Sequence, residues 1–247
     1  MKQTKLFNRL PWLVAALGAA GMILRWCLYK VNLDDRLLLV PGHPLEILVW
    51  LLTAGTAVLI AACTWKQKEP AAYEGNFPPS KAACIGNCVA AFLICYTVLS
   101  REPRIPGAPG VLWKVLGVLS APSLLAAGFG RRLKHKTAAL GYLVPCLFYL
   151  IHIVTHYRAW GSESQLQTVF FPLLSSATLT FFLFHTAAFA VDISRRGRQL
   201  GTGLAGAFLC MVNLSRTDYP WLCLAGVTLC LTSLCAWNPA PEGRNEP

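Results

Sequence analysis

Five ionisable side chains in this sequence could together bind a divalent metal. Two of them, His152 and His156, are four residues apart, so on a helix they share one face. A third, His43, follows the adjacent carboxylates Asp34 and Asp35 in a short polar stretch. Imidazole and carboxylate are zinc ligands, and a carboxylate can also orient a ligating histidine. The pattern predicts a divalent metal site formed by these five residues, and the sequence indicates no other cofactor.

The stretch around His43 has a second interpretation that needs no metal. Pro44 suits the first position of a helix, because an N–H group at that position has no partner within the helix and proline lacks one. His43 would then be the N-cap and Glu46 the third helical residue, from which a carboxylate can reach back to the cap. Arg25 could pair with one of the two aspartates and hold the loop in place. The sequence leaves both interpretations open.

The rest of the chain must position these residues within a membrane. Of its 247 residues, 55% are hydrophobic and 13% are charged, whereas soluble domains carry about 25% charged residues. The apolar residues form blocks of about 17–25, the length of a helix that crosses a bilayer, and they lack the alternation of barrel strands. The sequence predicts an all-α fold: a polytopic transmembrane helical bundle of about eight spans with no soluble domain. The predicted spans cover residues 12–29, 45–65, 82–99, 111–129, 138–156, 166–191, 200–214 and 220–237.

The distribution of positive charge predicts how these spans are threaded. Lysine and arginine concentrate in cytoplasmic loops. With the N-terminus inside, fourteen of the 22 lysines and arginines fall in inner segments and six in outer ones. This favours eight spans over seven, the alternative that the short seventh span leaves open. We expect a protein of the cell (cytoplasmic) membrane, with a cytoplasmic N-terminus at residues 1–11, the bundle at 12–237, and a disordered cytoplasmic tail at 238–247.

The net charge of +11 indicates a lipid partner. Topology and attraction to anionic inner-leaflet lipids both explain it. The densest basic cluster, formed by Arg131, Arg132, Lys134 and Lys136, is expected to lie beside such lipids. Nucleic acid is not expected as a partner, because no basic domain stands apart from the membrane, and the sequence indicates no particular protein partner.

Two features that look like cofactor motifs have simpler explanations. The ten cysteines lie almost all within spans and contain no Cys-x-x-Cys pair, so we expect small packing residues rather than disulfides or ligands. The stretch GTGLAG, residues 201–206, matches the dinucleotide pattern G-x-G-x-x-G, but no strand precedes it. We expect its glycines, like Gly21 in the first span, to allow close contact between helices.

The segment LLLVPGHPLEILVWLLTAGTAVL includes most of the second predicted span. It resembles the corresponding part of uncharacterised multi-pass membrane proteins of gut Clostridia. The resemblance covers about the first third of the chain. It implies a bacterial cytoplasmic membrane and carries no activity that could be assigned to a residue.

The interior of the predicted spans argues against an ion-driven pump. Away from the span ends they contain no Asp, Glu, Lys or Arg, whereas coupled transport usually relies on such groups. Asn87, Asn213 and the hydroxyl-rich stretch SSATLT after Pro172 could line a polar cavity or serve helix packing. The leading interpretation is a non-enzymatic, transporter-like or accessory membrane component with a small-molecule cavity. The alternatives are a membrane enzyme or redox protein with the histidine-ligated metal at its outer face, and a structural partner subunit. No catalytic residue is predicted.

Overall fold

The computed structural model describes residues 2–32, 39, 42–65, 73, 77, 79–102, 107–133, 135–160 and 166–235. For residues 2–8, 158–160 and 166–168 only the course of the backbone is described. Within these ranges the chain forms helices and no β-strand. They are α1 (Lys2–Val31), α2 (Pro44–Trp65), α4 (Lys81–Ser100), α5 (Ala108–Arg132), η1 (Lys136–Tyr142), α6 (Leu143–Trp160), α7 (Leu166–Ala188), η2 (Phe189–Val191), α8 (Arg196–Asn213) and α9 (Pro220–Cys235).

Each predicted span corresponds to one α-helix, and most bounds agree to within a few residues. The exceptions are α1, which begins at Lys2 and continues past Pro11, and the fifth predicted span, whose first five residues lie in η1 and not in α6. In the described part of the chain, six segments are long and apolar enough to cross a membrane: Arg9–Val31, Pro44–Trp65, Lys81–Ser100, Ala108–Arg132, Lys136–Tyr157 and Val169–Val191. The α9 helix is apolar but shorter, and α8 begins with Arg196 and Arg198. The all-helical fold is confirmed and the apolar helices fit a multi-pass membrane protein, while the count of eight spans stays a prediction. The predicted tail lies outside the described residues.

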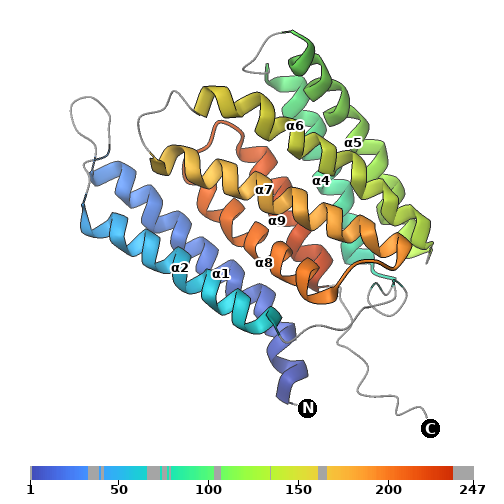
Figure 1. Cartoon of the computed structure of the whole chain (residues 1–247), viewed down its shortest axis with the longest axis horizontal. Coiled ribbons are helices and arrows are strands. Elements are labelled where there is room, and N and C mark those ends of the chain that lie inside the picture. Colours follow the sequence, from blue (N-terminus) through green and yellow to red (C-terminus); the bar gives the residue numbers. More distant parts are fainter. Residues whose placement is uncertain are drawn as a thin grey trace.

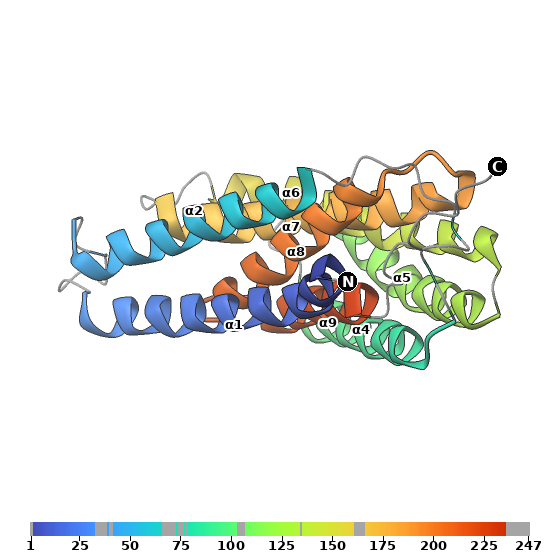
Figure 2. The same cartoon turned by 90° about the horizontal axis from the view of Figure 1, so that it is seen from below.

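Six helices form a closed ring, and the first two helices pack outside it. Around the ring, α4 contacts α5, α5 contacts α6, α6 contacts α7, α7 contacts α8, α8 contacts α9, and α9 contacts α4 again. The pair α1 and α2 packs against α8 and lies at one edge of the molecule (Figures 1 and 2). As a result α8 forms most of the contact between the ring and the α1–α2 pair, with smaller contributions from α7 and α9.

Close contacts set the relative directions of the helices. Gly18 and Gly21 of α1 face Met211 and Val212 of α8, so these two helices run parallel. Gly203 of α8 faces Leu234 of α9, so α8 and α9 run antiparallel. The start of α1 and the end of α9 therefore lie at the same end of the bundle. We call this the inner end and the opposite one the outer end, following the predicted topology; which end faces the cytoplasm stays a prediction.

The glycines of α1 and α8 serve helix packing, as predicted. A Cβ at Gly21 would lie 2.7 Å from the Val212 side chain, and one at Gly203 would lie 2.9 Å from the Phe182 ring. Such distances are too short for carbon atoms, so only glycine allows these helices to approach so closely. Gly203 belongs to the GTGLAG stretch, and its position inside α8 excludes the turn that a dinucleotide site needs.

The start of α2 confirms that His43 acts as a helix cap. The Leu45 N–H donates to His43 Nδ1 at 3.2 Å, and the His43 carbonyl accepts from the Glu46 N–H at 2.9 Å. The Glu46 carboxylate reaches back to the Gly42 N–H at 3.1 Å, one residue before the cap. Gly42 has φ of 82°, a conformation that suits glycine and turns its N–H toward the first helical turn.

Candidate ligand-binding cavity at the outer end

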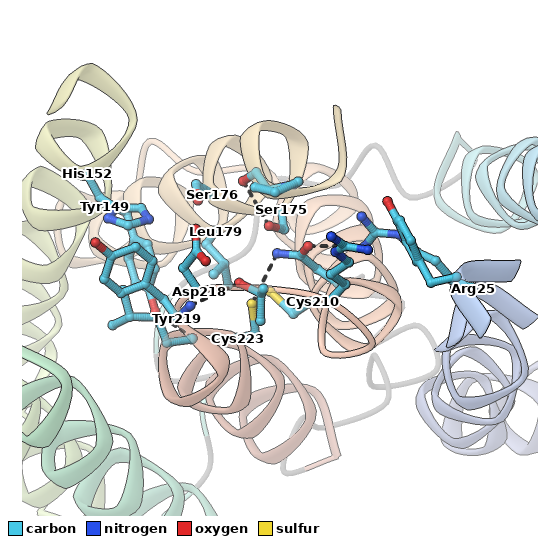
Figure 3. Close-up of a pocket in the computed structure, with 16 residues that line it drawn as sticks. Arg25, Tyr149, His152, Ser175, Ser176, Leu179, Cys210, Asp218, Tyr219 and Cys223 are labelled. Carbon is cyan, nitrogen blue, oxygen red and sulfur yellow. Dashed lines mark hydrogen bonds between the residues drawn. The ribbon is translucent and has the colours of Figure 1, made fainter. Parts of the chain in front are cut away.

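A cavity of about 220 Å³ lies at the outer end, between α1, α6, α7, α8, the turn after α8, and α9 (Figure 3). Its volume is well above the roughly 10–15 Å³ that one water molecule needs. Its lining is unusually polar for a helical bundle in a membrane. The polar and charged side chains that line it are Arg25, Tyr29, Tyr149, His152, Ser175, Ser176, Asn213, Arg216, Thr217, Asp218 and Tyr219.

Arg25 is held in the cavity wall by α7 and α8. Its side chain has 0% exposure. Its Nη1 donates to Asn213 Oδ1 at 3.2 Å and to the Val212 carbonyl at 3.4 Å. Its guanidinium carbon lies 4.6 Å from the centre of the Phe171 ring, a cation–π distance. Gly21, one turn earlier on the same face of α1, lets α1 approach α8 closely enough for these bonds.

Asn213 connects Arg25 to the opposite wall. Because its Oδ1 accepts from the guanidinium, its Nδ2 is left as the donor, and it points to Cys223 Sγ at 3.3 Å. The amide is thereby fixed in one orientation. Asn213 is the last residue of α8, and Cys223 lies in the first turn of α9, so this link spans the turn between the two helices.

The charged groups of the cavity are mainly positive. Arg216 is exposed and lies over the Tyr29 ring, with 4.5 Å between its guanidinium carbon and the ring centre. The Arg25 guanidinium is 5.6 Å from the same ring. Among the lining residues that the structure describes, the only carboxylate is Asp218. Two guanidinium groups against one carboxylate favour an anion over a cation inside the cavity.

The hydroxyl-rich stretch of α7 divides between the two uses that the sequence left open. Ser175 and Ser176 line the cavity (Figure 3). Ser175 Oγ donates to the Pro172 carbonyl at 3.0 Å. The Thr178 and Thr180 hydroxyls bond back to their own helix, at Leu174 O and Ser176 O. The two serines thus line the cavity, and the two threonines that follow bond to the backbone of their own helix.

His152 and His156 lie together on α6, as their spacing predicts, with ring centres 4.1 Å apart. His156 Nδ1 is 2.8 Å from the His152 carbonyl, which can only accept, so Nδ1 carries the proton. In the neutral ring Nε2 then accepts from the Tyr219 hydroxyl, 2.8 Å away. His152 Nδ1 accepts from Trp113 Nε1 at 3.2 Å, so a neutral His152 carries its proton on Nε2. Tyr219 and His152 both line the cavity.

The structure brings together two of the three histidines predicted to bind metal. Both ring nitrogens of His156 are engaged with protein groups. His43 caps α2, which packs against α1 and α8, whereas α6 packs against α5 and α7. In the described part of the chain no group of three or more His, Cys, Asp or Glu side chains could hold a metal ion. Asp34 and Asp35 lie outside the described residues, as does their pairing with Arg25, so the five-residue site stays a prediction.

Several residues of the cavity do not follow from the sequence pattern alone. Trp113 reaches the histidines from α5 and Tyr219 from the turn before α9, and no local spacing relates them. Tyr149 could have been found, because it precedes His152 by three residues and shares its face of α6. Its hydroxyl donates to the Leu222 carbonyl at 3.1 Å.

The basic cluster predicted to contact lipid is only partly exposed. Arg131 is 2% exposed and its Nη1 donates to Ser233 Oγ at 3.2 Å. Arg132 is exposed. Lys136 is half-exposed and forms an ion pair with Asp192 at 2.8 Å. Lys134 lies outside the described residues. Contact between this cluster and lipid stays a prediction, and Arg131 is turned into the protein.

Comparison of the chain with family models, with curated proteins and with solved structures found no match. The assignment of function therefore rests on the geometry of the cavity.

Proposed function

We propose that this chain is a non-enzymatic, transporter-like or accessory component of a cell membrane, and that its outer-end cavity binds a small anion. The observation that carries the proposal is the fully buried Arg25 in the wall of a polar cavity. A charged side chain within a membrane span is costly, and such groups usually face a partner or a water-filled cavity with a function.

The cavity supplies donors for an anionic ligand on several sides. The guanidinium groups of Arg25 and Arg216 supply charge and planar N–H donors, which suit carboxylate and phosphate oxygens. Ser176 supplies a hydroxyl donor from α7. The volume of about 220 Å³ limits the ligand to a small molecule. Charge, donors and size thus agree on a small oxyanion.

Thermal unfolding of the purified chain in mild detergent tests this proposal. We expect one or more members of a panel of inorganic phosphate, sulfate, acetate and short dicarboxylates to raise the unfolding midpoint, while glycerol and choline do not. Hydrogen bonds to a charged group contribute roughly 1.5–3 kcal/mol, so Arg25→Gln should weaken binding at least about tenfold. Arg132→Gln, an exposed arginine at the inner end, is the matched control and should bind as the parent does. If no anion raises the unfolding midpoint, or if Arg25→Gln binds the anion as tightly as the parent does, the proposal is wrong.

A membrane enzyme is the second candidate, and one observation favours it. The His156–Tyr219 hydrogen bond of 2.8 Å lies at the wall of the cavity, and such a pair can transfer a proton. Incubation with the anion that stabilises the protein, followed by mass spectrometry of that anion, separates the candidates. Chemical conversion that Tyr219→Phe abolishes would favour the enzyme, whereas an unchanged anion favours the binding component.

The lipid partner and the location extend the same proposal. The exposed Arg132 and the half-exposed Lys136 are available to anionic inner-leaflet lipids. The charge distribution of the loops supports a threading with both termini inside, and the resemblance to Clostridial proteins implies a bacterial cytoplasmic membrane. Accessibility of the outer cavity to an impermeant reagent in intact cells would test this orientation.

A further inference from the structure

A groove at the inner end lies between the end of α7 and the start of α8. It measures about 300 Å³, and its lining consists of apolar side chains together with His185, Ser194 and two arginines. Its apolar wall includes Phe184, Val191 and Ile193, which are 50%, 56% and 77% exposed. Arg195 and Arg198 are also exposed. Both arginines border a neighbouring groove of about 580 Å³ beside the end of α2 as well, so they are accessible from two sides.

The start of α8 concentrates positive charge where the helix end is already positive. Arg195 is the N-cap, Arg196 and Arg198 follow within one turn, and the first turn contains no acidic residue. Cations at a helix N-terminus are electrostatically unfavourable, and an anion there is favourable. Asp192, the nearest acidic residue in the sequence, pairs with Lys136 instead. An anion beside Arg195 and Arg198 would relieve this repulsion.

The apolar wall indicates what carries the anion. The α7 segment Val169–Val191 is a candidate span, so in a bilayer its exposed Phe184 and Val191 face acyl chains. The arginines after its end then lie at the level of the head groups. Guanidinium groups bind phosphate oxygens in bidentate geometry. A phosphate joined to an acyl chain matches both parts of the groove, whereas a free anion would use only one.

We propose that this groove binds an anionic phospholipid from the inner-end leaflet. Its phosphate lies against Arg195 and Arg198, and one acyl chain lies along Phe184, Val191 and Ile193. The site is separate from the outer cavity and shares no residue with it, so either proposal can fail without the other.

Lipid-dependent thermal unfolding of the full chain in mild detergent tests the site. We expect phosphatidylglycerol to raise the unfolding midpoint, while phosphatidylcholine and inorganic phosphate do not. Equal stabilisation by phosphatidylcholine would show that the negative charge is not recognised. Equal stabilisation by inorganic phosphate would show an anion site that makes no use of the apolar wall. Either result overturns the proposal, as does no response to phosphatidylglycerol.

Two variants assign the effect to the groove. Each arginine near an anionic bilayer strengthens binding roughly fivefold, so the double variant R195Q/R198Q should bind phosphatidylglycerol about thirtyfold more weakly. The double variant R9Q/K81Q removes two exposed cations of the same end outside the groove and should bind normally. Equal loss in this control would show a general charge effect and overturn the proposal.

The variant Ile193→Asp provides a test that does not depend on α8. Ile193 is 77% exposed, so the change should leave the lipid-free unfolding midpoint unchanged. Its carboxylate would repel the phosphate and disrupt the acyl-chain contact, so phosphatidylglycerol binding should be lost. Binding that persists in this variant would contradict the proposed position of the lipid.

Discussion

Arg25 and Arg131 are two buried arginines near opposite ends of the bundle, with similar immediate partners. Arg25 is 0% exposed and Arg131 is 2% exposed. Each donates to a neutral side-chain oxygen at 3.2 Å, of Asn213 and of Ser233 respectively. Each guanidinium also lies over a phenylalanine ring, at 4.6 Å and 4.9 Å. From these contacts alone the two residues would be expected to play the same role.

Their wider surroundings differ. Arg25 borders a cavity that other polar side chains also line. Arg131 lies beneath Phe77, which stacks on Tyr73 and packs on the edge of Phe189. Phe77 and Tyr73 belong to the main apolar core of the described residues. The inner arginine therefore closes one end of the bundle, while the outer arginine places its charge beside a space for a ligand. The comparison shows that burial of an arginine does not itself define a site.

The largest expected effect is the loss of stability in Arg131→Ala. This change removes the side chain on which Phe77 packs and the bond to Ser233. We expect the free energy of unfolding in detergent to fall by roughly 2–4 kcal/mol, because both packing and a buried hydrogen bond are lost. The neighbouring Arg132 is exposed, so Arg132→Ala should change the free energy of unfolding by less than about 0.5 kcal/mol. Similar losses in the two variants would mean that Arg131 does not close the inner end.

A methyl group added at the inner end should also destabilise the protein. A Cβ at Gly86 of α4 would overlap the Thr232 side chain of α9, and forced overpacking costs about 1–3 kcal/mol. Gly55 of α2 has nothing within 4 Å of such a Cβ. Gly55→Ala is therefore the matched control, and it should be neutral or gain up to about 1 kcal/mol from helix propensity. Unfolding midpoints that do not distinguish the two variants would contradict close packing of α4 on α9.

Arg25→Ala should cost less stability than Arg131→Ala but should abolish anion binding. The space that the side chain leaves joins an existing cavity, so we expect a loss of only about 1 kcal/mol. Unfolding midpoints with and without the stabilising anion measure both effects in one experiment. A loss of stability as large as that of Arg131→Ala, with anion binding retained, would reverse the roles assigned to the two ends.

The smallest expected effect concerns the exposed pair of Asp192 and Lys136 at the inner end. The Lys136 ammonium donates a hydrogen bond to Asp192 and holds the pKa of that carboxyl below its ordinary value. The resulting stabilisation is present above the unfolded-state pKa and is lost as the pH falls through the folded-state pKa. Asp192→Asn should therefore be slightly less stable than the parent at about pH 7, and the difference should disappear as the pH falls through the folded-state pKa of Asp192. Asparagine also tolerates the φ of 55° at this position. A difference in stability between the two proteins that grows on acidification would contradict a stabilising ion pair.

The sequence predicted the helices and the local details better than the contacts between helices. Block length and apolar composition were sufficient for eight helices, most of them within a few residues of their observed bounds, although not for the start of α1 or for the 3-10 helix η1. The cap at His43 and the shared face of His152 and His156 also followed, because both depend on residues close in sequence. Close packing at Gly21 was predicted from residue size, although not its partner Val212.

The cavity itself could not be predicted, because its walls come from helices far apart in sequence. Nothing in the spacing of residues relates Arg25 to Asn213, which are 188 positions apart, or His156 to Tyr219. Likewise, the sequence of the basic cluster at residues 131–136 does not indicate that Arg131 is buried while Arg132 is exposed. Periodicity determines which face of a helix is polar, and helix neighbours determine which polar groups meet.

Thiol labelling of Cys223 in intact cells tests most directly the claim that a water-accessible, positively charged cavity opens at the outer end. Cys223 lines the cavity, whereas Cys230 lies two turns further along α9 and is 0% exposed. With either cysteine retained alone, small impermeant methanethiosulfonates should label Cys223 and not Cys230. The anionic reagent should react faster than the cationic one, and Arg25→Gln should remove that preference. Equal labelling of both cysteines, no labelling of Cys223, or faster reaction with the cationic reagent would contradict the account.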